Sequence, residues 1–229
     1  MIYYWLFNNS ITAQQAVALF LISVFVYIIS ITLHEFAHAF VALKMGDDTP
    51  KLAGRVSLNP IKHLDMMGFI SFMFLGIGWA KPVPINPLKF KKYRKGTRAV
   101  SIAGIVTNIL IGFLAAGIHL LLLNTVGIPS MAMEYVYVTL QYFMLINSFL
   151  AMFNLLPIYP MDGFNFITSF MKTENKFIQF SLRNSFKIML TIVVVCLATN
   201  LMFGFDLLDW YLQILYNFAY MPIAWLGVL

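Results

Sequence analysis

The sequence predicts an all-α polytopic membrane protein with about five to six transmembrane helices and a re-entrant or short β-like segment near the cytoplasmic face. Of its 229 residues, 61% are hydrophobic and only 10% are charged. Soluble domains are typically about 45–50% apolar and about 25% charged. All 15 lysines and arginines fall within two windows, residues 44–98 and 172–187. Apolar runs separate these windows, as expected for a chain that crosses a bilayer repeatedly.

The two basic windows predict the topology. Lysine and arginine concentrate in cytoplasmic segments of membrane proteins, so we expect both windows to be cytoplasmic and the N-terminus to lie outside. The net charge of +6 is then explained by this distribution, and we expect the lipid bilayer rather than a nucleic acid as partner. The basic run from Lys89 to Arg98 is expected to meet anionic headgroups.

The length allows one membrane-embedded domain over residues 1–229, with a catalytic core at about 13–171 and C-terminal helices at 185–229. A single cysteine leaves no internal disulfide.

The first apolar segment predicts one helix over residues 13–45 that enters from outside. At about 1.5 Å per residue, this helix is long enough to cross a bilayer core. Gly46 and Pro50 are residues that end helices. Residues 51–64 mix alternating hydrophobicity with glycine and proline, which predicts a short strand pair or an ordered loop at the membrane surface.

The next apolar segment, residues 66–80, is too short for an untilted span. We expect it to be re-entrant or partly inserted. Residues 81–87 contain three prolines, which forbid a helix and predict a stiff loop. Together, residues 66–87 form a candidate gate, or an edge that pairs with an extended peptide.

Four further spans are expected. Residues 99–124 run outward, residues 133–153 return, and residues 188–203 run outward again. The last predicted span, residues 210–229, contains Pro222, which interrupts a regular helix.

The predicted first helix contains the pattern H-E-x-x-H at residues 34–38. Residues four apart lie on the same face of a helix. His34 and His38 can therefore bind one Zn²⁺, with Glu35 placed to take a proton from a water on the metal. Ionisable residues are costly inside a membrane, which favours a functional site over a buried histidine pair in the core.

A second unusual stretch reads N-x-x-P-x-x-P-x-D-G from Asn154 to Gly163. Its prolines break the helix, so freed carbonyls must find partners in protein or water. Taken alone, Asp162 is equally well interpreted as the N-cap of a helix over residues 163–171 or as a site residue. Catalytic zinc normally takes three protein ligands, and the H-E-x-x-H pattern supplies two, which favours Asp162 as the third.

Two other polar residues allow more than one interpretation. His63 could in principle be a metal ligand, but its position among basic residues favours a solvated loop residue. Asn108 lies at membrane depth in the span over residues 99–124, where it either forms a helix–helix hydrogen bond or contributes to a site.

The paired motifs resemble those of the site-2 protease family of intramembrane zinc metalloproteases. The similarity extends to G-R-V-S-L-N-P from Gly54, to G-W-A-K-P-V-P-I-N-P from Gly78, and to the segment from Ser101 to Asn108. These look like segments of the compact bacterial and archaeal members, and the resemblance covers about residues 30–165. Ile105 stands where the family often has proline. We expect no PDZ or CBS domain.

The resemblance implies one Zn²⁺ per chain, bound by His34, His38 and Asp162, with Glu35 as general base. It also implies that Asn154, and with it Asn108, lies near the substrate carbonyl or its developing oxyanion.

In function, the resemblance implies a zinc-dependent endopeptidase that cleaves transmembrane segments of single-span membrane proteins near the cytoplasmic side. The setting would be regulated intramembrane proteolysis or clearance of signal-peptide remnants, in the plasma membrane of a prokaryote. The alternative is a divalent-metal transporter or channel, which would also use intramembrane His, Glu and Asp but should show paired repeats with broken helices. A third alternative is a membrane scaffold without catalytic activity, but such a protein would have no need of the metal ligands and the general base. The sequence assigns no oligomeric state.

Overall fold

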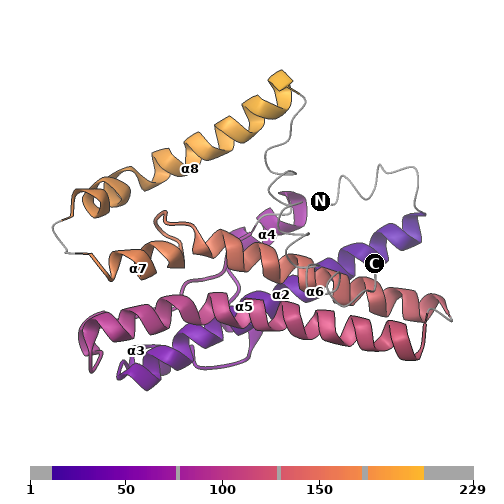
Figure 1. Ribbon diagram of the computed structural model, residues 1–229, viewed down its shortest axis with the longest axis horizontal. Coiled ribbons are helices and arrows are strands. Elements are labelled where there is room, and N and C mark those ends of the chain that lie inside the picture. Colours follow the sequence, from indigo (N-terminus) through magenta and orange to yellow (C-terminus); the bar gives the residue numbers. More distant parts are fainter. Residues whose placement is uncertain (1–11, 76–77, 128–129, 172–174, 204–229) are drawn as a thin grey trace.

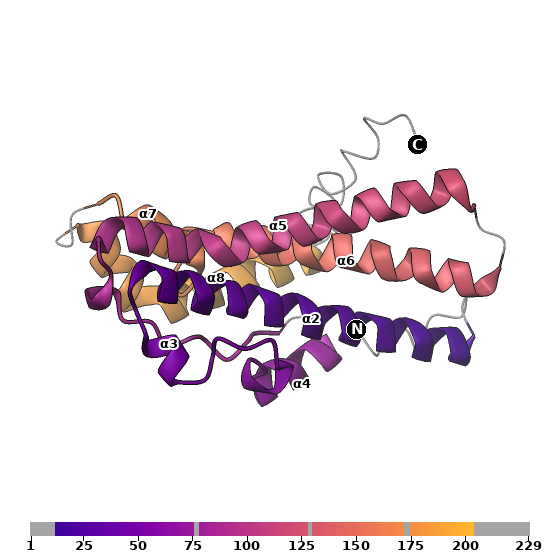
Figure 2. The ribbon, with the colours of Figure 1, turned by 90° about the horizontal axis from the view of Figure 1, so that it is seen from below.

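The computed structural model describes residues 12–75, 78–127, 130–171 and 175–203, and this part of the chain contains helices and no strand. Three helices in it are long and apolar enough to cross a membrane: α2 (Ala13–Met45), α5 (Tyr93–Thr125) and α6 (Met131–Leu155). They lie side by side, α5 antiparallel to both of the others (Figure 1; Figure 2). The predicted all-helical membrane fold is confirmed to this extent: the described residues are helical and include three candidate spanning helices.

Helix α2 has the predicted bounds, and its ends have clear physical causes. Thr12 caps the first turn, because its hydroxyl accepts the Gln15 N–H while the Gln15 side chain accepts the Thr12 N–H. At the other end, Gly46 adopts φ +112°, a left-handed conformation that glycine alone adopts without strain. Its N–H bonds back to the carbonyls of the last helical turn.

The core that fixes the helices lies between α2, α6 and the short helix α4 (Met66–Leu75). Its buried members are Val26, Tyr27, Ile31, Phe72 and Ile146. The rings of Tyr27 and Phe72 stack with centroids 3.8 Å apart, so α4 packs against the middle of α2. Leu64 and Ala80 form an isolated antiparallel bridge, so both ends of the segment that contains α4 lie together.

The loop between α2 and α4 is ordered rather than a strand pair. It contains helix α3 (Thr49–Leu52) and the 3₁₀ turn η1 (Pro60–Lys62). His63, which we expected to be solvated, is fully buried. The expectation was wrong because the loop folds back on itself: the His63 Nε2 lies 2.7 Å from the Ser57 carbonyl oxygen.

Helix α5 begins six residues before the expected span, because it continues past the membrane-depth segment into the basic window. Before it, the turn η2 (Pro87–Lys89) ends the proline-rich loop. After α6, the chain turns into α7 (Asp162–Thr168) and then α8 (Lys176–Phe203). Helix α8 covers residues 188–203, where a further span was predicted, but it is not one of the three candidate spanning helices of the described residues. The predicted last span lies outside the described residues. Figure 1 shows α7 and the start of α8 at the same end of the molecule as α3.

Candidate metal centre

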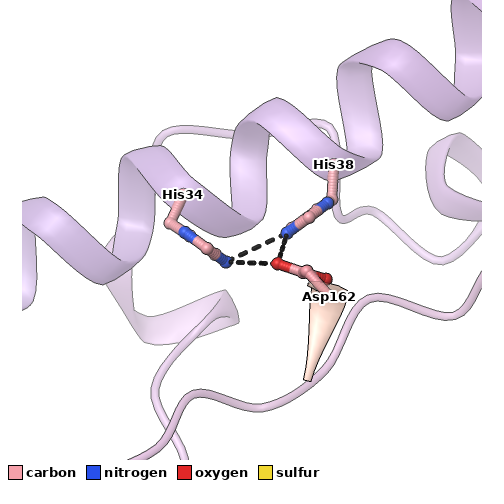
Figure 3. A group of neighbouring side chains, drawn as sticks. All are labelled: His34, His38 and Asp162. Atoms are coloured by element: carbon pink, nitrogen blue, oxygen red, sulfur yellow. Dashed lines mark hydrogen bonds and ion pairs between the residues drawn. The ribbon is translucent and has the colours of Figure 1, made fainter. Parts of the chain in front are cut away.

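His34 and His38 lie one turn apart on α2 and point to the same place. Their Nε2 atoms are 3.0 Å apart, and both residues are buried, with 7% and 6% of their surface exposed. The Asp162 Oδ2 lies 3.2 Å from the His34 Nε2 and 3.0 Å from the His38 Nε2. Figure 3 shows the two imidazoles and the carboxylate converging from opposite chain segments. The two sequence motifs thus place two imidazole nitrogens and one carboxylate oxygen 3.0 to 3.2 Å from one another.

The tautomer of His38 follows from its second ring nitrogen. Nδ1 lies 2.8 Å from the Val100 carbonyl oxygen on α5. A carbonyl only accepts hydrogen bonds, so Nδ1 carries the proton and Nε2 of the neutral ring presents its lone pair to the cluster. A backbone carbonyl behind a ligating histidine is the usual way in which a metal site orients its imidazole.

The cluster has the donor set and spacing of a divalent metal site. Two imidazole nitrogens and one carboxylate oxygen suit zinc, and ligand atoms around tetrahedral zinc lie roughly 3.3 Å apart. The three measured separations are 3.0 to 3.2 Å. Three lone-pair atoms repel at such distances unless a cation or a proton lies between them. The residues therefore fit a metal ion, which the burial of both histidines and the partial burial of Asp162 favour.

Asp162 reaches the histidines because α6 ends early. Leu155 is its last residue, and Pro157 and Pro160 prevent the helix from continuing. Asp162 is the first residue of α7, and the N-cap position is occupied by Met161. The N-cap interpretation of Asp162 is therefore wrong. The next residue, Gly163, has to be a glycine because a Cβ atom at this position would overlap the carbonyl of Leu155.

Glu35 lies beside the cluster and has its own partners. Its Oε2 accepts the Val83 N–H at 3.2 Å and lies 3.9 Å from Nη2 of Arg55. The Glu35 side chain is 12% exposed. The carboxylate is thus held between the loop after α4 and a buried cation.

A cavity of about 470 Å³ opens onto the cluster. This volume is in the range of pockets that bind small molecules or a few residues of peptide. His34, Glu35, His38 and Asp162 all line it. The other lining residues are Pro82, Val83, Ile85, Pro87, Phe90, Thr97, Val100, Ser101, Asn154, Tyr159, Pro160 and Asn165.

The two asparagines expected near the site lie in different places. Asn154 lines the cavity and donates to the Leu150 carbonyl at 2.9 Å. Asn108 is fully buried in α5 and is not among the cavity-lining residues. Its amide finds no hydrogen-bond partner in the part of the chain that the structure describes. His63 is buried against Arg55 and Ser57, and it is not part of the metal cluster.

Sequence reasoning missed three features of the site. Gly104 of α5 lies directly against both imidazoles, Arg55 lies behind Glu35, and the Val83 N–H bonds Glu35. Gly54-Arg55 and Gly104 were noticed only as parts of family-like segments. Sequence spacing does not reveal that Gly104 lies against the two imidazoles or that Arg55 lies beside Glu35.

Comparisons with known proteins agree with this geometry. Residues 123–198 match the family described as Peptidase family M50, a segment that contains Asp162 but not the histidine pair. The "Putative zinc metalloprotease YwhC" of Bacillus subtilis is 44% identical over 146 residues, covering 61% of this chain and 64% of that protein. The "Putative zinc metalloprotease Rip2" of Mycolicibacterium smegmatis is 24% identical over 212 residues, covering 90% of this chain and 79% of that protein. No solved structure matches the chain.

The fold and the site define a class: a membrane-embedded helical protein with two buried histidines and a partly buried aspartate clustered beside a second carboxylate. The family match and the relatives point the same way. The chain is similar to Peptidase family M50 and to putative zinc metalloproteases, which agrees with the resemblance of its two motifs to the site-2 protease family.

Proposed function

We propose that the protein is a zinc-dependent intramembrane endopeptidase. The observation that carries the proposal is the convergence of His34, His38 and Asp162 beside Glu35 on one cavity. Hydrolysis of a peptide bond needs an activated water, a Lewis acid at the carbonyl and a donor for the developing charge. The partial match to Peptidase family M50 and the names of the relatives support the same reaction.

The proposal gives each residue a role. His34, His38 and Asp162 hold one zinc ion, which when bound supplies a Lewis acid for a water and for the substrate carbonyl. Glu35 takes the proton of the attacking water and passes it to the leaving amine. Asn154 lies on the cavity wall, where its amide can face the substrate carbonyl. Asn108, which lies outside the lining, has no role in this proposal.

The substrates are transmembrane segments of single-span membrane proteins, cut near the cytoplasmic side in regulated proteolysis or in clearance of signal-peptide remnants. Both basic windows face the cytoplasm and the N-terminus faces outward, in the plasma membrane of a prokaryote. The whole chain forms one domain with about five to six spans. The segment that contains α4 enters and leaves the membrane on one side, which the bridge between Leu64 and Ala80 supports.

Divalent-metal transport is not favoured. A transporter of this kind should have interrupted helices in both halves of the chain. Within the described residues, the break after Leu155 is not matched by a second one in α2 or α5.

The test is cleavage of a single-span reporter by purified protein in liposomes, comparing the wild type with Glu35→Gln. Glu35→Gln keeps the shape and all three metal ligands, so it should retain zinc and lose at least about 10³-fold in rate. Zinc flux that survives Glu35→Gln, with no cleavage by the wild type, would replace the protease with a transporter.

A further inference from the structure

Arg55 is a buried cation in a protein with few charges. Only 5% of its surface is exposed. Burying a guanidinium is costly unless it is paired and hydrogen-bonded. Within the described residues, its acidic ion-pair partner is Glu35, at 3.9 Å between Nη2 and Oε2. A solvated loop residue would not bury its charge in this way, so the burial of Arg55 needs another explanation.

The two backbone partners of Arg55 belong to one short segment, residues 81–83, which we name the strap. The Arg55 Nη1 donates to the Pro82 carbonyl at 2.9 Å, and Nη2 donates to the Lys81 carbonyl. The strap in turn donates the Val83 N–H to Glu35. Glu35, the strap and Arg55 thus form a closed ring of contacts, while Pro82 and Val83 also line the cavity.

His63 supports this ring from behind. Its Nε2 lies 2.7 Å from the Ser57 carbonyl oxygen, so Nε2 carries the proton and Nδ1 accepts from the Arg55 Nη2 at 3.4 Å. The His63 carbonyl accepts the Lys81 N–H at 2.8 Å. One buried histidine therefore fixes both the guanidinium and the start of the strap.

We propose that Arg55 is a positioning residue that holds the Glu35 carboxylate and the strap in one fixed arrangement. The inference rests on the proposed protease function, in which Glu35 must face a water on the metal. A glutamate side chain has three rotatable bonds, and a base displaced by about 1 Å can cost about 10²-fold in rate. Arg55 does not line the cavity, so it acts through Glu35 and the strap rather than on the substrate.

Arginine suits this task better than lysine. Its planar fork donates in fixed directions to two successive carbonyls, and Nη2, one of the two donating nitrogens, also lies 3.9 Å from the Glu35 carboxylate. A lysine ammonium would supply the charge without that geometry. Arg55→Lys therefore separates a need for charge from a need for the fork.

The experiment compares Arg55→Gln, Arg55→Lys and the control Lys62→Gln in the full-length protein. Lys62 is an exposed residue of the same loop, and its replacement removes the same charge. For each variant we would measure zinc content, kcat and KM with the single-span reporter, and hydrogen exchange in the strap. Residues 82 and 84 are prolines, so a peptide covering residues 81–84 reports chiefly the amides of Lys81 and Val83.

We expect Arg55→Gln to keep its zinc and a KM within about threefold of the wild type, and to lose roughly 10- to 100-fold in kcat. Its strap amides should exchange at least about 10-fold faster. Arg55→Lys should recover less than half of the lost kcat, and Lys62→Gln should match the wild type. If Arg55→Gln does not fold, the comparison of Arg55→Lys with the wild type provides the test.

Wild-type kcat and exchange in Arg55→Gln would overturn the inference, and so would loss of zinc in parallel with activity. Failure of the proposed function gives a different result, because wild type and Glu35→Gln would then be equally inactive. The exchange measurement still tests the strap in that case.

Discussion

Gly104 on α5 faces His34 on α2 at a distance that leaves no room for a side chain. A Cβ atom at residue 104 would lie 2.5 Å from Nε2 of His34 and 2.5 Å from Nε2 of His38. These are the same nitrogens that converge on Asp162. The backbone of α5 therefore forms one wall of the metal cluster, and glycine is required there for close approach rather than for backbone flexibility.

Gly104→Ala should therefore damage the metal cluster. The added methyl group must push α5 away or turn the imidazoles, and overpacking of this kind costs about 1–3 kcal/mol. We expect zinc affinity to fall at least about 10-fold, with loss of cleavage. Zinc content after dialysis against a weak chelator gives the measurement.

Gly117→Ala is the matched control on the same helix, because no atom lies within 4 Å of a Cβ at that position. Alanine is a better helix former than glycine, so this variant should bind zinc like the wild type. Equal zinc retention in the two alanine variants would contradict the close packing at Gly104.

Asp162→Asn should weaken metal binding without changing the shape of the side chain. The amide lacks the negative charge that balances a divalent cation, so we expect a loss in zinc affinity of roughly 100-fold or more. Competition with a chromogenic chelator measures it. In the wild type, a strong chelator should abolish cleavage, and Zn²⁺ should restore it. Restoration by Mg²⁺ alone would contradict a nitrogen-rich site.

Much of the fold and part of the site were predictable because they depend on local pattern. The bounds of α2 follow from an apolar run that ends at Gly46. The meeting of His34 and His38 follows from helical spacing. Asp162 lies far along the chain, and its inclusion depended on the ligand count of zinc and on the family resemblance, which the structure then matched with distances of 3.0 and 3.2 Å.

The remaining features depend on long-range packing, which a sequence pattern does not contain. Lys62 and His63 are neighbours in a basic loop, yet Lys62 is exposed and His63 is fully buried. The difference arises because His63 meets Arg55, eight residues earlier in the chain. For Asn108, the sequence favoured a helix–helix hydrogen bond over a place in the site. In the structure another asparagine, Asn147, makes that contact between helices.

Asn147 should stabilise the packing of α6 on α2. It is fully buried and its Nδ2 donates to the Ser30 Oγ at 2.8 Å. Asn147→Ala should lower the free energy of unfolding by about 1–3 kcal/mol, because it removes the bond and leaves a small cavity. Combining it with Ser30→Ala should give a coupling energy of about 0.6 kcal/mol, the average for hydrogen bonds between membrane helices. Unfolding in mixed micelles provides these values.

The control is Asn184→Ala on α8. Its Nδ2 donates to the Phe180 carbonyl within its own helix. That change should stay within about 0.5 kcal/mol. A similar cost at both positions would argue against the contact with Ser30.

His63 should make stability depend on pH. Burial lowers the pKa of His63, and the nearby charge of Arg55 also lowers it. The folded state therefore keeps the ring neutral at pH values where the unfolded chain, with an ordinary pKa of about 6.5, already binds a proton. This contribution is complete above about pH 6.5 and is lost as the pH falls below it.

The loss has an upper limit of about 1.4 kcal/mol per pH unit for one proton. Thermal unfolding in detergent between pH 7.5 and pH 5.5, comparing the wild type with His63→Gln, isolates it. Protonation of the metal ligands affects both proteins equally. We expect the melting temperature of the wild type to fall more steeply with decreasing pH than that of His63→Gln. Parallel curves would mean that His63 titrates as it does in the unfolded chain.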